Sequence, residues 1–444
     1  MKKPESPPGV GRYFEELLHN KDLNRLAQLL AFGPDDQRYL HWDKLRHMRP
    51  PAGLSHEEWW FAIKMGRRGN YRQIPLTDLS GQTFNFAMPD SVSECLHHID
   101  QEAAGQIIME EPPIANPETR DRYIIHSLIE EAITSSQLEG AATTRVVAKE
   151  MIRTNRLPRD RNEQMILNNY AAMQEIRRFK DRPLDQDLIL TLHRLLTRNA
   201  LDDPSAAGRL RRPNETVDVA TPYNEVLHTP PPAEELPERL ERLCSFANAA
   251  DTKPFIHPVM RAIILHFWLA YDHPFIDGNG RCARGLFYWS MLRQGYWLFE
   301  FLSISQIIRK APAKYGRAFL YCETDDNDLT YFILYHLEVI QRAIGELHAY
   351  VARKTEQVRQ TEKLLRASDR FNHRQLALLS HALRHADAQY TINSHRTSHG
   401  IVYETARSDL FDLVEKGLLA KRKAGRRMVF RPIENLAESL GRIR

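Results

Sequence analysis

A short loop between two apolar runs places the strongest constraint on how this chain folds. Residues 273–281 read His-Pro-Phe-Ile-Asp-Gly-Asn-Gly-Arg, and another arginine follows at position 284. The apolar runs Met260–Ala270 and Ala283–Leu292 on either side predict two buried helices. Glycine permits positive φ and a close approach of the backbone. A Gly-Asn-Gly turn that opens a helix leaves free N–H groups at the positive end of the helix dipole. We therefore expect this loop to bind an anion such as a phosphate group.

The polar side chains of the loop fit chemistry on a phosphorylated ligand. His273 can abstract a proton near neutral pH, and Asp277 offers hard oxygen ligands to Mg²⁺. Arg281 and Arg284 lie three residues apart, so we expect both to project from the first turn of the second helix toward similar space. The alternative is that the glycines form only a turn and that His273 is a hydrogen-bonded core residue.

The loop resembles the signature of the Fic family, His-x-Phe-x-(Asp/Glu)-Gly-Asn-Gly-Arg-x-x-Arg, at every fixed position. The resemblance implies a mainly α fold with a Fic helical core. It also implies a nucleotidyltransferase that moves AMP from ATP to a Tyr, Ser or Thr hydroxyl of a protein, either another protein or itself. His273 would be catalytic, and Asp277 would hold Mg²⁺. The residues that the resemblance assigns to nucleotide binding are Phe275, Asp277, Gly278, Asn279, Gly280, Arg281 and Arg284.

The family resemblance also implies a role for each part of the loop. Residues 278–280 would seat the α- and β-phosphates, Arg281 would bind the β-phosphate, and Arg284 would hold the γ-phosphate. His273 would take the proton of the attacking hydroxyl, while Phe275 would point the other way and anchor the loop in the core. Catalysis would then come mostly from positioning and charge stabilisation.

An inhibitory motif is expected before the loop. Residues 123–140 form an amphipathic pattern that predicts a helix ending at Gly140. Within it, Ser135-Ser-Gln-Leu-Glu139-Gly140 resembles the family's inhibitory motif, (Ser/Thr)-x-x-x-Glu-(Gly/Asn). Glu139 would pair with Arg284 and compete with the γ-phosphate. The alternative is a solvated glutamate at a helix end.

A β-hairpin is expected inside an otherwise helical region, residues 160–345. Val217-Asp218-Val219, Pro222-Tyr223-Asn224 and Val226-Leu227-His228 predict two short strands and a turn. In Fic proteins a hairpin "flap" at this place borders the active site and pairs with the target segment by strand addition. Gly208–Arg211 before it and Pro230–Pro232 after it resemble the family's flanks. The alternative is a hairpin that only caps the fold.

We expect four parts along the chain. Residues 1–115 form a leading subdomain of unknown role whose tryptophans (Trp42, Trp59 and Trp60) we assign to a core. Residues 116–354 form the Fic domain, residues 355–370 a charged helical connector, and residues 371–435 a winged-helix module. The stretch after residue 370 carries 13 Lys and Arg against 7 Asp and Glu, while the rest of the chain is close to neutral.

The C-terminal module has two candidate partners. Its basic wing (Lys421, Arg422, Lys423, Arg426 and Arg427) and the outward side chains expected on its recognition helix (Tyr403, Arg407 and Ser408) fit DNA phosphates. A protein-docking module with a solvated basic face is the alternative. Two other functions also stay open: a de-AMPylating or bifunctional enzyme, and a DNA-binding regulator whose Fic core only senses nucleotide.

The remaining features limit the class of protein. The four cysteines are widely spaced, which fits reduced thiols in a cytoplasm, and no signal peptide or membrane span is expected. Oligomerisation is compatible with the sequence. A zinc site at His257, His266 and His273 is disfavoured because no acid or thiol joins them in register. Tyr315 lies where family members often carry a Tyr-Tyr pair near the adenine, but glycine follows it in this chain.

Overall fold

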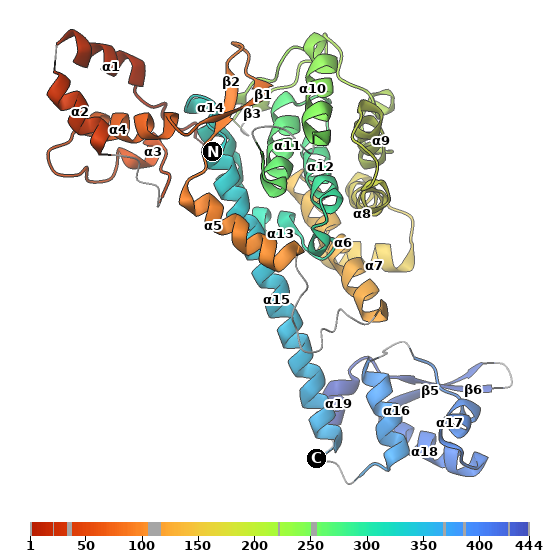
Figure 1. Ribbon diagram of the computed structural model, residues 1–444. Helices are drawn as coiled ribbons and strands as arrows, with labels where there is room; N and C mark the ends of the chain where they lie inside the picture. The colour runs from red at the N-terminus through yellow and green to blue at the C-terminus, as the bar shows by residue number, and fades with distance from the viewer. Residues whose placement is uncertain are drawn as a thin grey trace. The chain divides into compact units, whose positions relative to one another are not determined.

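The structure, a computed structural model, describes residues 2–20, 22–32, 38–104, 117–220, 223–249, 255–366, 370–384, 388–424 and 427–442. The backbone divides into two compact units, residues 1–347 and residues 348–444. The chain is mainly helical, as the sequence predicted (Figure 1). Within the described ranges, no helix has both the length and the apolar character needed to cross a membrane.

Helices make up most of the chain, and short hairpins interrupt them. The helices up to residue 366 are α1 Val10–His19, α2 Leu23–Ala31, α3 Trp42–Leu45, α4 His56–Arg68, α5 Asp90–Ile99, α6 Pro117–Leu138, α7 Arg145–Thr154, α8 Arg161–Phe179, α9 Gln186–Thr197, α10 Leu236–Asn248, α11 Pro258–Asp272, α12 Asn279–Arg293, α13 Ile304–Lys310, α14 Pro312–Thr324 and α15 Thr330–Arg366. Two antiparallel hairpins lie among them, formed by β1 Arg72–Thr77 with β2 Thr83–Phe86, and by β3 Val219–Ala220 with β4 Val226–His228. The last elements are α16 His373–Arg384, α17 Ile392–His399, α18 Tyr403–Glu415, β5 Leu419–Ala424, β6 Arg427–Pro432 and α19 Leu436–Arg442.

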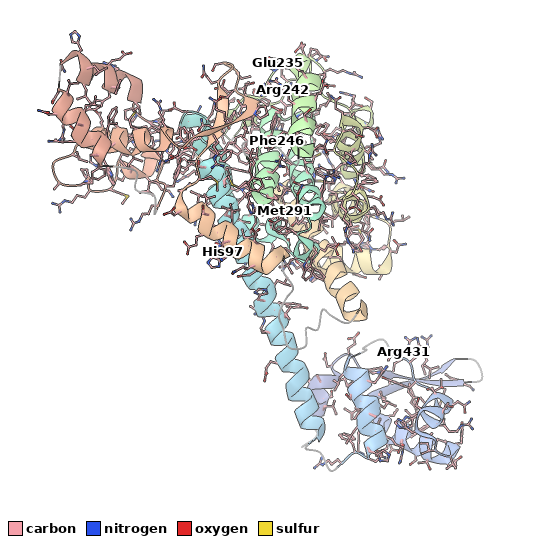
Figure 2. All side chains as sticks on the ribbon, viewed as in Figure 1. His97, Glu235, Arg242, Phe246, Met291 and Arg431 are labelled. Atoms are coloured by element: carbon pink, nitrogen blue, oxygen red, sulfur yellow. The ribbon has the colours of Figure 1, made fainter. Side chains whose placement is uncertain are left out.

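Two adjacent helices form the centre of the first unit. Nearly every side chain of α11 and α12 is buried, because their apolar runs leave no polar face for solvent. These helices pack against each other, and α12 also packs against α8 and α9. Figure 2 shows side chains filling the space between the helices of this unit. The loop 273–278 joins α11 to α12, so it is held at both ends by the most buried helices of the fold.

Residues before α6 belong to the same compact unit as the central helices. The three tryptophans expected in a core are buried there, packed with α1, α2 and α4. Also on α4, buried Lys64 pairs with Asp325 at 2.5 Å, and Arg67 donates to the Tyr331 hydroxyl at 2.9 Å. These contacts hold the N-terminal helices against the turn between α14 and α15.

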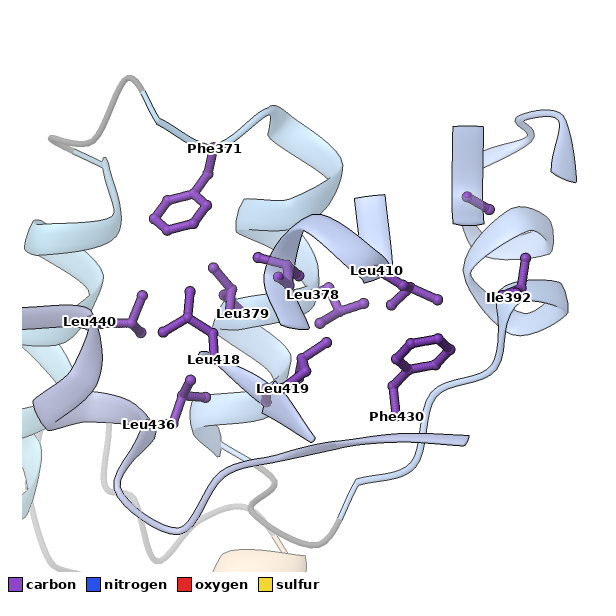
Figure 3. Packing of buried hydrophobic residues seen from close by; sticks show 13 residues of the cluster. Phe371, Leu378, Leu379, Ile392, Leu410, Leu418, Leu419, Phe430, Leu436 and Leu440 are labelled. Carbon is purple, nitrogen blue, oxygen red and sulfur yellow. The ribbon is translucent and has the colours of Figure 1, made fainter. Parts of the chain in front are cut away.

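The C-terminal unit has its own apolar core. Ala406, Leu410 and Leu413 of α18 are fully buried, and Phe430 of β6 packs with them (Figure 3). Strands β5 and β6 form the expected hairpin, with Leu419 opposite Pro432. The predicted connector at 355–370 is helical as far as Arg366 and continues α15. Arg426 of the predicted wing lies outside the described residues, as does the side chain of Arg427.

Candidate active site

The loop between α11 and α12 has a fixed backbone. His273 ends α11 in the left-handed region with φ 46°, and its N–H donates to the Leu269 carbonyl. Asn279 closes the loop, because its Oδ1 accepts from the Phe275 N–H at 2.9 Å and its Nδ2 donates to the Phe275 carbonyl at 2.7 Å. Gly278 has φ 87°, which favours glycine at this position. The Asn279 side chain therefore maintains the loop, and only its backbone N–H is left to face a ligand.

The imidazole of His273 is set up as a proton acceptor. Its Nδ1 lies 3.1 Å from the Ala270 carbonyl oxygen. Because a carbonyl can only accept, Nδ1 carries the proton and Nε2 keeps a free lone pair. Burial lowers the pKa of His273 to about 4, so the ring is neutral at pH 7. The structure therefore gives His273 the tautomer that a general base needs.

A second histidine, which the sequence did not single out, supports the loop from α9. The ring of His193 stacks on Phe275 with centroids 3.7 Å apart. Its Nδ1 accepts from the Gly208 N–H at 3.0 Å, and its Nε2 donates to the Asp277 carbonyl at 2.9 Å. Phe275 is fully buried, as expected of an anchor, and its ring supports the loop by stacking on His193. Its assignment to nucleotide binding stays a prediction.

Arg211 links the loop to both flanks of the β3–β4 hairpin. Its Nε donates to the His273 carbonyl at 3.0 Å, and its backbone N–H donates to the Pro274 carbonyl at 2.9 Å. Its guanidinium also donates to the Pro231 carbonyl on the other side of the hairpin. The sequence had placed Arg211 and Pro231 only in the flanks of the flap, and the structure shows that they hold the loop.

The two arginines of the loop contact different elements. Arg281 is buried and donates to the Leu196 carbonyl of α9 at 2.9 Å. Its guanidinium also pairs with Asp277, with 3.3 Å between the guanidinium nitrogen and Oδ1. Arg284 is equally buried and donates to Ser135 Oγ at 2.8 Å, the Ser135 carbonyl at 3.0 Å, and Glu139 Oε1 at 2.8 Å. The expectation that both project toward similar space is wrong, because Arg281 finds its acceptor on α9 and Arg284 finds its acceptors on α6 and at Glu139.

Glu139 lies against the first turn of α12, where an anion is favoured. A Cβ added to Gly280 would overlap the Glu139 carboxylate, so the absence of a side chain at Gly280 makes room for it. Burial lowers the pKa of Arg284, but the Glu139 carboxylate, together with Tyr315 and Glu131, outweighs burial and leaves that pKa raised. Gly140, with φ 92°, turns the chain directly after Glu139. The expected contact between Glu139 and Arg284 is confirmed.

Residues 183–291 match the model of the Fic/DOC family. Two known relatives of similar sequence are protein adenylyltransferase fic-1 of Caenorhabditis elegans, 31% identical over 183 residues, and protein adenylyltransferase Fic of Drosophila grimshawi, 30% identical over 184 residues. The alignments cover 40% and 41% of this chain and 33% and 35% of those proteins. The chain thus spans about a third of the length of the relatives that it matches.

A solved structure resembles a larger part of the chain. The crystal structure of a Fic family protein from Desulfovibrio desulfuricans G20 superposes with a TM-score of 0.53 and 20% identity. The superposition covers 79% of this chain and 98% of that one. At this identity the likeness concerns the fold alone, and it confirms the mainly helical Fic fold.

Asp277 is the acidic side chain of the Fic/DOC loop. Its Oδ1 accepts from the Gly278 N–H at 2.5 Å, and Arg161 lies 3.4 Å from its Oδ2. About a third of the Asp277 side chain is exposed, so an oxygen is accessible. No group of three His, Cys, Asp or Glu side chains that could hold a metal occurs in the part of the chain that the structure describes. A magnesium ion fits at Asp277 only with phosphate oxygens completing its ligands.

The predicted hairpin is confirmed, with Val219 opposite His228 and Ala220 opposite Val226. Pro222 of the predicted turn lies outside the described residues. His266, one of the histidines weighed for zinc, is fully buried and lies 2.8 Å from the hydroxyl of Tyr315. The Tyr315 hydroxyl is therefore hydrogen-bonded to His266 inside the helical core.

Proposed function

We propose that this protein is an adenylyltransferase that moves AMP from ATP to a Tyr, Ser or Thr hydroxyl of a protein. The observation that carries the proposal is the free lone pair on His273 Nε2 in the loop whose glycine turn opens α12. The Glu139 carboxylate already lies at that helix end, which supports an anion site there. The match to the Fic/DOC family and the names of the relatives support the same reaction.

The chain's own residues can accept the proton of the target hydroxyl and stabilise the charge of the phosphates. As the target hydroxyl oxygen attacks the α-phosphorus of ATP, its proton passes to His273 Nε2, a P–O bond forms to AMP, and pyrophosphate leaves. The backbone N–H groups of Asn279 and Gly280 and the Arg284 guanidinium stabilise the phosphate charge. Asp277 would hold Mg²⁺, which supplies further neutralisation of phosphate charge when bound.

The same site carries a proposed inhibition. Glu139 occupies Arg284 and the helix end that a γ-phosphate would need. Ser135 holds the other side of the Arg284 guanidinium through two hydrogen bonds, so Arg284 stays oriented when Glu139 leaves. Ser135, Glu139 and Gly140 together form the proposed inhibitory segment.

The proposal is tested by labelling with ATP that is radioactive at the α-phosphorus. Purified full-length protein and a Glu139→Gly variant are incubated with this ATP, magnesium and a cell lysate. We expect label in protein, more of it with the variant, and none when His273 is also replaced. Absence of label from both proteins, with ATP bound and the fold intact, would refute AMP transfer.

Removal of AMP is a second candidate function, and the place of Glu139 favours it. Its side chain is 28% exposed, and its charge acts on His273, opposing the dominant effect of burial on that residue's pKa. A carboxylate in this position can orient a water for attack on a phosphoester. If the protein removes AMP, Glu139→Gly should abolish removal while it raises transfer.

We further propose that the C-terminal unit is a winged-helix module that binds a partner. Tyr403, Arg407 and Ser408 of α18 are exposed, as are Lys421 and the two basic residues after it on β5. A cationic strand beside an exposed helix fits duplex DNA, and an acidic protein surface is the alternative. Binding that weakens steeply with salt and prefers certain DNA sequences would decide for DNA.

A further inference from the structure

His228, the last residue of β4, contacts two other elements at once. Its Nδ1 lies 2.8 Å from Glu323 Oε2 on α14, and its Nε2 lies 2.8 Å from the Tyr271 carbonyl oxygen at the end of α11. Only about a tenth of its side chain is exposed. We propose that His228 is a positively charged clasp that fixes the flap, the β3–β4 hairpin, beside His273 and positions the protein target. This inference rests on the proposed AMP transfer.

The two contacts together determine the charge of the ring. A carbonyl oxygen can only accept a hydrogen bond, so Nε2 of His228 carries a proton. An ionised carboxylate also only accepts, so Nδ1 facing Glu323 carries a proton as well. Both contacts form at once only when the imidazole is protonated on both nitrogens. Removal of either proton breaks one of the two contacts.

The charged groups around His228 favour this state. Glu323 faces it from α14, and Asp272 and His273 face it from α11. Asp272 is already neutralised by Arg239, whose Nε lies 2.7 Å from its Oδ1, and His273 is neutral. Burial lowers the pKa of His228, but the Glu323 hydrogen bond and charge, the Tyr271 carbonyl and the remaining charge of Asp272 together outweigh burial, so the pKa is raised. The carbonyl end of α11 adds negative partial charge.

The clasp completes a two-point attachment of the flap. Arg211 before the hairpin binds the His273 and Pro231 carbonyls, and His228 at the end of β4 binds the carbonyl of Tyr271, two residues before His273. A target strand added to the flap is therefore held in register with the base only while His228 keeps both contacts. Its positive charge also helps to keep His273 neutral.

The direction of the pH dependence follows from the raised pKa. The folded state binds the proton of His228 more tightly than the unfolded chain, whose histidines titrate near 6.5. The clasp therefore contributes fully below pH 6.5 and is lost as the pH rises through the raised pKa of His228. Flap fixation should weaken toward alkaline pH.

The first experiment is a titration of the full-length protein with ¹³C-labelled histidine, followed by NMR. A His228→Gln variant identifies the resonance of His228. We expect His228 to titrate above 6.5, and its pKa to fall in a Glu323→Gln variant but not in Glu323→Asp. Titration at or below the ordinary value, or no response to Glu323→Gln, would overturn the charged clasp.

The second experiment measures protection of the flap amides by hydrogen exchange across pH, with Mg·ATP affinity as a readout of the nucleotide site. Loss of one hydrogen bond to a charged group should reduce flap protection about tenfold in His228→Gln, with ATP affinity unchanged. The matched control is His257→Gln, which removes a histidine–carboxylate pair with Asp100 at 3.0 Å, away from the flap. Equal flap protection in wild type and His228→Gln would overturn the positioning role. Neither experiment needs AMP transfer, so failure of the proposed function would not be confused with failure of the clasp.

Discussion

Replacing Glu139 tests whether the pair with Arg284 limits the use of ATP. Glu139→Gly removes the carboxylate from the first turn of α12, while Ser135 keeps its two bonds to Arg284. The freed guanidinium is then available to a γ-phosphate in an unchanged orientation. Glu139→Gln removes the charge alone and keeps the side-chain volume and the backbone freedom of the wild type.

The expected change in ATP affinity follows from the geometry of the Arg284–Glu139 pair. The Arg284–Glu139 bond is 2.8 Å long and charge-assisted, and such bonds contribute about 1.5–3 kcal/mol. Because 28% of the Glu139 side chain is exposed, solvent weakens the pair, and we expect the lower half of that range. The dissociation constant for Mg·ATP should therefore fall by about twelve- to fortyfold in Glu139→Gly, and by less in Glu139→Gln.

The assay is calorimetric titration of Mg·ATP into the full-length protein, combined with thermal unfolding. Without ATP, both variants should unfold at a lower temperature, because the buried Arg284 guanidinium loses its carboxylate partner. ATP should stabilise the variants more than the wild type, since ligand binding to the folded state adds its own free energy.

A carboxylate pair far from the loop serves as the control. Arg25 binds Glu58 through two bonds of 2.8 Å among the N-terminal helices. Glu58→Gln should lower stability and leave ATP affinity unchanged. Unchanged ATP affinity in both Glu139 variants, or an equal change in Glu58→Gln, would show that Glu139 does not compete with the nucleotide.

Three further outcomes are expected. His273→Asn, which tolerates the φ of 46°, should abolish label transfer and leave Mg·ATP affinity intact by calorimetry; equal loss of both would mean that His273 is structural. In a Glu139→Gly background, the acid limb of kcat/KM should lie at or below 4, because burial lowers the pKa of His273 to about 4 and the Glu139 charge that raises it is gone. Chemical denaturation should show stability falling as pH drops from 6.5 toward 4, because the unfolded chain takes up the proton first; a limb at 6.5 would contradict this. Truncation after Arg370 should leave self-labelling nearly intact; a folded truncated protein unable to use ATP would show that the C-terminal unit belongs to the active site. In the full-length protein, Lys421→Gln with Lys423→Gln should reduce the salt slope of any DNA binding by about one per lysine.

Much of the loop could be predicted because its chemistry is local. The glycine turn, the end of α11 at His273 and the buried helices on both sides follow from residue types within a few positions of each other. The β3–β4 hairpin was predicted for the same reason. The burial of Phe275 was also expected, but its stacking partner was not.

The residues that the sequence did not reveal act from a distance in the chain. His193 and His228 belong to no motif, and each is one polar residue in an ordinary helical or strand pattern. Their roles come from acceptors 84 residues away for His193 and 43 residues away for His228. No periodicity or spacing contains that information.

The sequence by itself determined the chemistry of this protein: a base, a glycine turn at a helix end, an acidic oxygen and two guanidiniums in one loop. Local backbone preferences and hydrophobic periodicity are sufficient for that. The tertiary structure decided how those groups are used. It directs Arg281 to α9 and Arg284 to α6, and it brings Glu139 to Arg284 across 145 residues. The reason is that a buried guanidinium must find acceptors on whichever elements pack around it, and packing is a property of the whole fold.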